Sequence, residues 1–159
     1  MLTREKHAAL ESEIASLIGK MVLVMSRFEI NLNLSLRGLL KEKLGEDSEI
    51  QVSNMNLKDR IDRWRKEVAT NFADDRELIA SLDAWHVTMT PIREKRNRFI
   101  HGYWIVDGKE NEVVNLTMSI PGSPETDEIR LSLDDLRSEV QKIEDAVDEF
   151  FRLRRKWSF

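Results

Sequence analysis

The feature that most constrains the fold is a helical repeat of apolar residues in the first third of the chain. From Leu10 to Leu32, apolar residues recur every three or four positions, which is the period of one face of an α-helix. Between Ile18 and Leu40 the only charged residues are Lys20, Arg27, Glu29 and Arg37. A helix that is apolar over more than one narrow stripe needs packing partners on more than one side. We therefore expect one side to pack within the protein's own bundle, with a second copy of the chain as a candidate for the other.

Three more stretches of helical period follow, and each has a start signal. Three polar residues are candidate N-caps, each followed three positions later by an acidic residue that can complete a capping box. The pairs are Asn56 with Asp59, Asp74 with Glu77, and Ser132 with Asp135. The predicted helices cover about residues 3–44, 56–68, 74–101 and 132–156.

Two residues mark expected irregularities in this helical pattern. Gly45 is expected to end the first helix, which leaves 45–55 as a loop. Pro91 is expected to kink the third helix, because proline has no amide hydrogen to donate and its ring crowds the preceding turn.

Between the third and fourth helices the period changes from helical to extended. Residues 103–106 and 113–118 flank Asp107-Gly108 and predict a hairpin, with 129–131 as a candidate third strand and a break at 121–124. The predicted fold class is therefore mainly all-α, a four-helix bundle with a small β-hairpin or three-stranded insertion at about residues 103–131. We expect residues 1–159 to form a single domain.

Composition limits the compartment and the chemistry. The chain has no cysteine, which excludes disulfides, thiolate metal sites and cysteine catalysis and favours a reducing cytoplasm. The first residues are charged and lack the apolar stretch of a secretory signal. The longest aliphatic run, residues 21–25, is far short of the roughly 20 residues that span a bilayer. We expect a soluble, cytoplasmic protein with no membrane association.

Charge is distributed unevenly along a chain whose net charge is −4. From Val106 to Phe150 there are 13 acidic and 4 basic residues. In contrast, residues 91–104 carry Arg93, Lys95, Arg96 and Arg98 against Glu94 alone, a local excess of +3. The acidic whole argues against a general nucleic-acid coat protein, because phosphate contacts normally need a basic surface. The local excess marks one place where a phosphate group could bind.

Common catalytic and cofactor motifs do not occur in this sequence. It has no glycine-rich phosphate loop, no His-Glu-x-x-His and no Gly-x-Ser-x-Gly. The three histidines, His7, His86 and His101, include no pair with ligand spacing on one helix, so we expect no metal site and no cofactor. We interpret His86 as a hydrogen-bonded core or interface residue and His7 as solvated.

Arg96 interrupts the apolar stripe of the third predicted helix. At 100° per residue from Leu78, it falls at the centre of the stripe, where a leucine would be expected. Burying a guanidinium is costly unless an acid, a phosphate or water compensates the charge. One interpretation is an ion pair with Glu29 or Asp59, and the other is a functional site; a paired arginine can also be functional.

Arg93, Asn97 and His101 follow one another at intervals of four along the same helix. Guanidinium groups stabilise developing negative charge, and an imidazole ordinarily titrates near pH 6.5 and can move a proton. This combination suits a phosphate group. The candidate catalytic residues are Arg96, Asn97 and His101, and the candidate substrate-binding residues are Arg93, Arg98 and Tyr103.

The segment Arg96-Asn97-x-x-x-His101-Gly102, late in a helical bundle, resembles the signature of HEPN (higher eukaryotes and prokaryotes nucleotide-binding) domains. A looser similarity extends along the chain. It involves Phe28-Glu29 in the first helix and residues 57–61 and 133–136, which open the second and the last.

The resemblance implies a metal-independent endoribonuclease, often a toxin or an antiviral or stress effector, in which two copies of the motif meet at a homodimer interface. His101 would then act on the 2′-hydroxyl of RNA as general base or orient it, Arg96 would stabilise the transition state, and Asn97 would position both. The products would carry 2′,3′-cyclic phosphate and 5′-hydroxyl ends. An antitoxin protein would be a possible partner. The acidic net charge departs from the pattern of a protein with a wide basic groove.

Two alternatives remain open at this point. One is a non-catalytic HEPN-fold module for dimerisation or partner binding, in which Arg96 is a structural ion pair. The other is a nucleotide-binding regulator that uses Arg93, Arg96 and His101 to hold a phosphate without cleaving anything.

Overall fold

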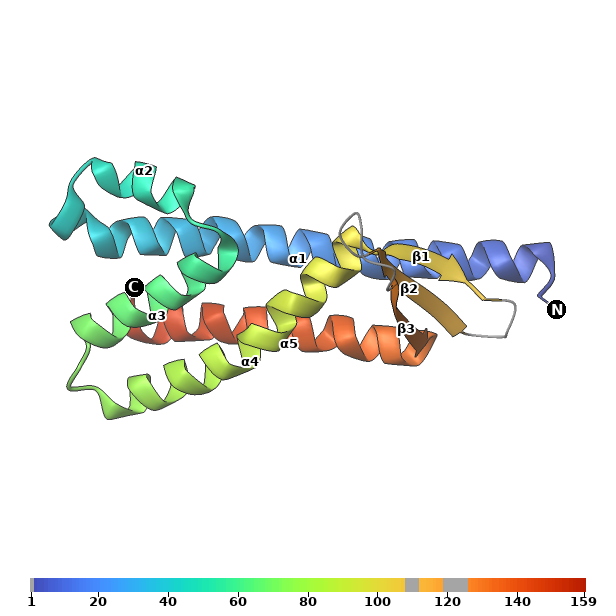
Figure 1. Ribbon diagram of the computed structural model, residues 1–159. Helices are drawn as coiled ribbons and strands as arrows, with labels where there is room; N and C mark the ends of the chain where they lie inside the picture. The colour runs from blue at the N-terminus through green and yellow to red at the C-terminus, as the bar shows by residue number, and fades with distance from the viewer. Residues whose placement is uncertain (1, 108–111, 119–125) are drawn as a thin grey trace. The chain divides into compact units, whose positions relative to one another are not determined.

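The computed structural model describes residues 2–107, 112–118 and 126–159. In this part of the chain the protein is mainly helical, with five helices and one small antiparallel sheet between the fourth and fifth (Figure 1). The helices are α1 (Arg4–Leu44), α2 (Asp47–Asn54), α3 (Leu57–Asn71), α4 (Arg76–His101) and α5 (Leu133–Trp157). The prediction of a mainly helical fold with a β insertion is confirmed.

The chain forms two compact units, which are described separately. The first unit comprises Met1–Leu23 and Glu94–Glu144, and the second comprises Val24–Arg93 and Asp145–Phe159. Helices α1, α4 and α5 each contribute residues to both units.

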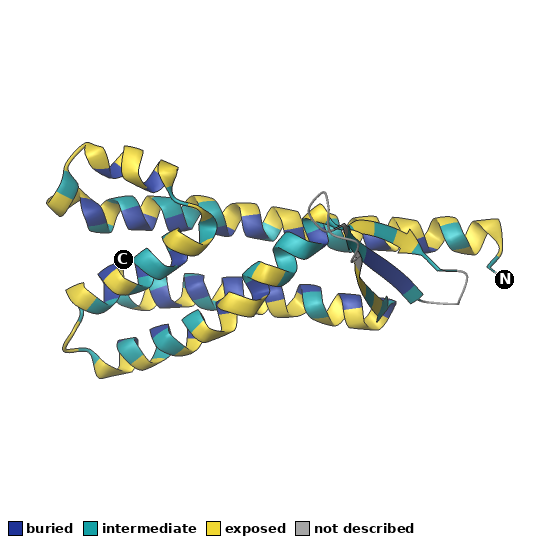
Figure 2. Cartoon of the chain, in the orientation of Figure 1, coloured by how far each residue is buried: buried dark blue, intermediate teal, exposed yellow. Residues whose placement is uncertain are grey.

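Aromatic residues form the centre of the second unit. Trp64 lies 5.2 Å from Trp85 and 5.0 Å from Phe150, measured between ring centroids, and Phe28 meets Phe150 edge to face at 4.9 Å. The indole of Trp64 donates to the hydroxyl of Ser35 at 2.9 Å, so its one polar atom is satisfied within the core. Figure 2 shows buried residues recurring along one side of each helix, as the apolar period predicts.

Helix α2 lies where a loop was predicted, so the four-helix count was wrong. Gly45 does end α1, with a positive φ of 56°, and its amide donates to the carbonyl of Lys41 at 2.9 Å. The chain then turns directly into α2, which buries only Ser48 and Val52. A helix of eight residues that buries one serine and one valine has little apolar periodicity, which is why the sequence pattern did not reveal it.

Two of the three predicted helix caps are confirmed, and one is shifted. Asn56 accepts from the amide of Asp59 at 2.9 Å, and the hydroxyl of Ser132 accepts from the amide of Asp135 at 3.0 Å. For α4 the cap is Asp75 rather than Asp74: its Oδ1 accepts from the amide of Leu78 at 2.9 Å. The indole of Trp157 donates to Oδ2 of Asp75 at 2.6 Å, so a contact distant in sequence favours this residue. Pro91 lies inside α4, as predicted.

The first unit contains a three-stranded antiparallel sheet of order β1-β2-β3. Its strands are β1 (Tyr103–Val106), β2 (Glu112–Met118) and β3 (Thr126–Ser132), so the hairpin is confirmed and the third strand is longer than predicted. In the register, Trp104 pairs with Asn115 and Thr117 pairs with Asp127. The expected turn residue Gly108 and the expected break at 121–124 lie outside the described residues.

Among the described residues, no helix combines the length and apolarity that a membrane span requires.

Candidate functional site: the C-terminal end of helix α4

The last turns of α4 carry most of the catalytic and substrate-binding residues that were predicted from the sequence. Arg96, Asn97, Arg98 and His101 belong to the first unit, and His101 is the final residue of the helix. Tyr103 follows at the start of β1. Arg93 also lies on α4 but belongs to the second unit.

The backbone directly after His101 is tightly packed at Gly102. The amide of Gly102 donates to the carbonyl of Arg98 at 2.8 Å, which closes the last turn of α4. A Cβ atom on Gly102 would lie 2.5 Å from both terminal atoms of the Asn115 side chain and 2.8 Å from that same carbonyl. Any side chain at position 102 would therefore force its neighbours to move, and the chain enters β1 directly after this glycine.

Arg96 and Asn97 are linked to one another. Nη1 of Arg96 donates to Oδ1 of Asn97 at 2.9 Å, which orients the amide beside the guanidinium. Arg96 is half-buried on the helix face that also carries buried Phe99, in agreement with its predicted place on the apolar stripe. The carboxylate of Asp59 accepts from the side chain of Asn56 at 2.8 Å, and the ion pair of Arg96 with Glu29 or Asp59 stays a prediction.

His101 presents an exposed imidazole at the helix end. Within the described residues, its ring makes no hydrogen bond or ion pair. A ring nitrogen that is not held by another protein group is available to accept or donate a proton.

The local excess of positive charge is partly neutralised within the first unit. Nζ of Lys95 lies 2.7 Å from the carboxylate of Glu139, which also pairs with Lys142 at 3.0 Å. Burial alone would raise the pKa of Glu139, but hydrogen bonds from the two lysines outweigh it and lower the pKa below its ordinary value. Arg98 pairs with Asp127 of β3. Lys95 and Arg98 thus face carboxylates, so the positive charge of 91–104 is less available to a phosphate group than the sequence predicted.

The aromatic residues after the helix have opposite roles. Trp104 packs against Phe99 with ring centroids 5.1 Å apart, and its indole donates to the carbonyl of Phe99 at 2.9 Å. Tyr103 is 61% exposed, so its ring is available to a ligand. Its assignment as a substrate-binding residue remains a prediction.

Two residues near this helix end, Asn115 and Asp127, were not predicted from the sequence. Asn115 could have been noticed as a polar residue within the apolar run Val113-Val114-Asn115-Leu116. Asp127 had no such signal, because only the pairing of β2 with β3 brings it to Arg98.

His86 is hydrogen-bonded, as predicted, but half-buried rather than part of the core. Its Nε2 lies 2.7 Å from Oδ1 of Asp62, whose other oxygen accepts from Nζ of Lys58 at 2.7 Å. All three residues belong to the second unit.

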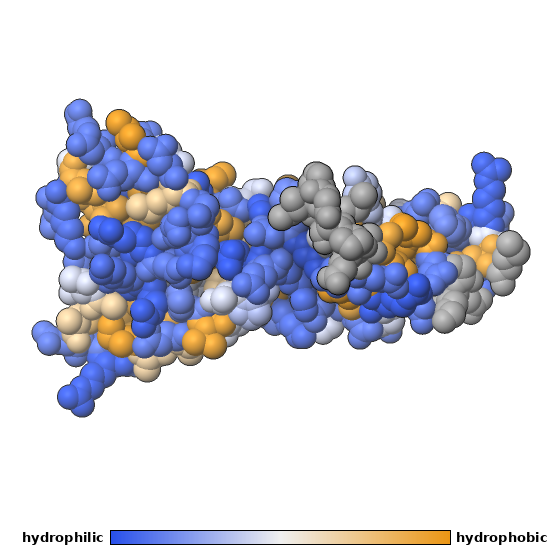
Figure 3. Space-filling model, in the orientation of Figure 1, coloured by the Kyte–Doolittle hydropathy of each residue, from blue (hydrophilic) through white to orange (hydrophobic). Residues whose placement is uncertain are grey.

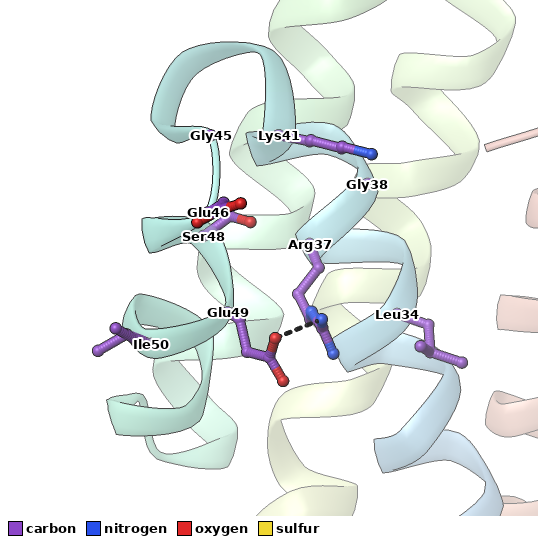
Figure 4. A pocket seen from close by; sticks show the side chains of 9 residues that line it. All are labelled: Leu34, Arg37, Gly38, Lys41, Gly45, Glu46, Ser48, Glu49 and Ile50. Atoms are coloured by element: carbon purple, nitrogen blue, oxygen red, sulfur yellow. Dashed lines mark ion pairs between the residues drawn. The ribbon is translucent and has the colours of Figure 1, made fainter.

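A pocket in the second unit lies between α1 and α2 (Figure 4). Nη2 of Arg37 and a carboxylate oxygen of Glu49 bridge it at 2.9 Å, while Leu34 and Ile50 point away from one another on either side. The pocket contains none of the candidate catalytic residues. The described residues include no group of three or more histidine, aspartate or glutamate side chains that could hold a metal ion.

Comparisons of the chain with family models, curated proteins and solved structures found no match. The assignment of a function therefore rests on the residues themselves.

Proposed function

We propose that this protein is a metal-independent endoribonuclease of HEPN type. The proposal rests on one observation: Arg96, Asn97 and His101 share the last turns of α4, with Asn97 bound to Arg96 and the imidazole of His101 exposed. A guanidinium, an amide and an imidazole at one helix end supply charge stabilisation, orientation and proton transfer. A toxin, or an antiviral or stress effector, is the role that this activity would serve.

The proposed reaction is transesterification within RNA. His101 accepts the proton of a 2′-hydroxyl, the 2′-oxygen attacks the adjacent phosphorus, and the bond between phosphorus and the 5′-oxygen breaks. The leaving oxygen takes up a proton from water and becomes a 5′-hydroxyl, His101 returns its proton to solvent, and the phosphate remains as a 2′,3′-cyclic diester. Arg96 stabilises the negative charge that develops on the phosphate oxygens, and Asn97 orients the guanidinium.

Exposed apolar residues on α1 support a homodimer, the state in which two motifs could act together. Ile30 and Leu34, both in the second unit, are 60% and 56% exposed and lie on one face of α1 at helical spacing. Figure 3 shows hydrophobic atoms beside hydrophilic ones in the region of α1 and α2, and Ile50 of α2 is 61% exposed. Exposed apolar surface of this kind is typical of protein interfaces.

The test is cleavage of mixed single-stranded RNAs by the purified protein in the presence of EDTA. Cleavage should persist in EDTA and leave 2′,3′-cyclic phosphate and 5′-hydroxyl ends. His101→Ala should abolish it, while His7→Ala, which removes a partly exposed imidazole elsewhere in the chain, should not. Cleavage that requires magnesium, or that survives in His101→Ala, contradicts the mechanism.

The same exposed residues favour a second candidate function. A non-catalytic module that binds a copy of itself or another protein, such as an antitoxin, would use Ile30, Leu34 and Ile50 directly. A wild-type protein that dimerises but cleaves no RNA supports this function. Binding of a nucleotide through its phosphate groups, without cleavage of RNA, would instead support the nucleotide-binding regulator.

A further inference from the structure

Asn115 is a buried polar residue in the middle of β2. It is 0% exposed, and neither its side-chain oxygen nor its side-chain nitrogen has a hydrogen-bond partner among the described residues. Asparagine is mostly found at protein surfaces, and a buried amide without partners destabilises the folded state. The preceding residues, Val113 and Val114, are both buried and apolar. An apolar residue would therefore favour stability at position 115, so packing stability alone does not explain the amide.

The contact that Asn115 makes lies next to His101. Both terminal atoms of its side chain lie 2.5 Å from the position that a Cβ on Gly102 would occupy, and the carbonyl of Arg98 lies 2.8 Å from the same point. The backbone of Gly102 is thus enclosed between the amide and the last turn of α4. Because Gly102 follows His101 directly, the same contact limits where the backbone of His101 can lie.

Two further bonds join this sheet to the helix end. Trp104, the register partner of Asn115, donates through its indole to the carbonyl of Phe99 at 2.9 Å. Arg98 donates to the backbone carbonyl of Asp127 at 3.2 Å. These bonds hold residues 98 and 99, whereas Asn115 is the side chain that touches the chain immediately after His101.

We propose that Asn115 is a positioning residue for His101. Its planar carboxamide is thin enough to lie flat against Gly102, while a branched apolar side chain has thicker methyl groups that would push Gly102 away. The amide thereby holds the last residue of α4 in one orientation for proton transfer. This inference rests on the proposed function for its catalytic meaning, but the effect on the His101 ring can be measured without any substrate.

The experiment compares wild type with Asn115→Ala and Asn115→Leu. Asn33→Ala is the matched control, because Asn33 also carries a buried side-chain oxygen without a hydrogen-bond partner among the described residues but lies in the second unit. The readouts are the nuclear magnetic resonance signals of the His101 ring, assigned with His101→Ala, together with kcat, KM and the melting temperature. Both Asn115 variants should shift or broaden the His101 signals and lower kcat by about 10- to 100-fold with KM changed less than about twofold. Asn33→Ala should leave the His101 signals and kcat unchanged.

Gly102→Ala tests the contact from the opposite side. The added methyl group should disturb the His101 signals in the same way, and combining it with Asn115→Ala should restore them in part, since the contact with the Arg98 carbonyl remains. If Asn115→Ala fails to fold, Asn115→Ser, which also removes the carboxamide but keeps a polar group, provides the same comparison.

Unchanged His101 signals in a folded Asn115 variant overturn the proposal, whatever the activity. If the wild type cleaves no RNA but the His101 signals respond as expected, the proposed function fails and the positioning role of Asn115 stands. If the wild type is active and Asn115→Ala keeps both kcat and the signals, only the positioning role fails.

Discussion

Nε2 of His86 on α4 lies 2.7 Å from Oδ1 of Asp62 on α3 and links the two helices within the second unit. Burial alone would raise the pKa of Asp62, but hydrogen bonds from Lys58 and His86 outweigh it and lower the pKa below its ordinary value. A carboxyl group whose pKa is lowered by folding stabilises the folded state above its unfolded pKa. That contribution is lost as the pH falls through the folded pKa.

His86→Ala should therefore lower the free energy of unfolding at neutral pH by about 1 kcal/mol, because it removes one hydrogen bond to a partly exposed carboxylate. Urea unfolding of the variant and of His7→Ala measures the effect. His7 pairs with exposed Glu11 at 3.6 Å, so its removal should change the free energy of unfolding by less than about 0.5 kcal/mol. Equal effects for the two variants would show that the link to Asp62 does not stabilise the fold.

Glu67 should make the stability of the second unit sensitive to acid. Its carboxylate is 3% exposed and accepts from Lys43 at 2.6 Å and from Arg63 at 2.8 Å. Burial alone would raise the pKa of Glu67, but the hydrogen bond from Lys43 and the charge of Arg63 outweigh it and lower the pKa below 4.5. The stabilisation is then fully present above about pH 4.5 and is lost as the pH falls below it.

Glu67→Gln should reduce the free energy of unfolding at pH 7 by about 1 to 3 kcal/mol, because an uncharged amide replaces the carboxylate. The difference from wild type should shrink as the pH is lowered through the range in which Glu67 is protonated. Unfolding measured at several pH values decides this. A difference that stays constant down to the most acidic pH would contradict the assigned pKa direction.

Core truncation should be costly at Leu82 or Ile143, which are 0% and 1% exposed. Replacing either residue with alanine should lower the free energy of unfolding by about 2 to 5 kcal/mol, as for other buried aliphatic side chains. Val87→Ala, at an exposed position of α4 outside the proposed dimer interface, is the control. A change below about 0.5 kcal/mol at Leu82 would mean that the buried face of α4 is assigned incorrectly.

The homodimer can be tested through the exposed face of α1. Light scattering should give twice the mass of the 18.6 kDa chain for wild type and the single-chain mass for Leu34→Glu, because a carboxylate in an apolar interface opposes association. Val87→Glu, at an exposed residue of α4, should leave the dimer intact. A wild-type protein that is monomeric at micromolar concentration rules out both the dimer and a composite active site.

Cleavage should also depend on the guanidinium of Arg96. Arg96→Ala should abolish cleavage, because the guanidinium stabilises the negative charge that develops on the phosphate oxygens. RNA cleavage assays of the purified variant beside wild type measure the effect. Cleavage that persists in Arg96→Ala would argue against this role.

Much of the fold could be predicted from the sequence because the signals involved are local. The apolar period determines which face of each long helix is buried, and the caps at Asn56 and Ser132 depend on residues within one helical turn. The grouping of Arg96, Asn97 and His101 is also local, since it follows from their spacing on a single helix.

Tertiary structure decided the features that depend on residues distant in sequence. Helix α2 buries only two residues and has little apolar periodicity of its own. The cap of α4 is Asp75 rather than the predicted Asp74, and Asp75 also accepts from the indole of Trp157. The sequence predicted that the positive charge of residues 91–104 could bind a phosphate group. The structure places Asp127 of β3 beside Arg98, which neutralises part of that charge. The contact of Asn115 with Gly102 likewise depends on tertiary structure, since it forms only when β2 lies against the end of α4. The two residues are thirteen positions apart, and no local sequence pattern links them.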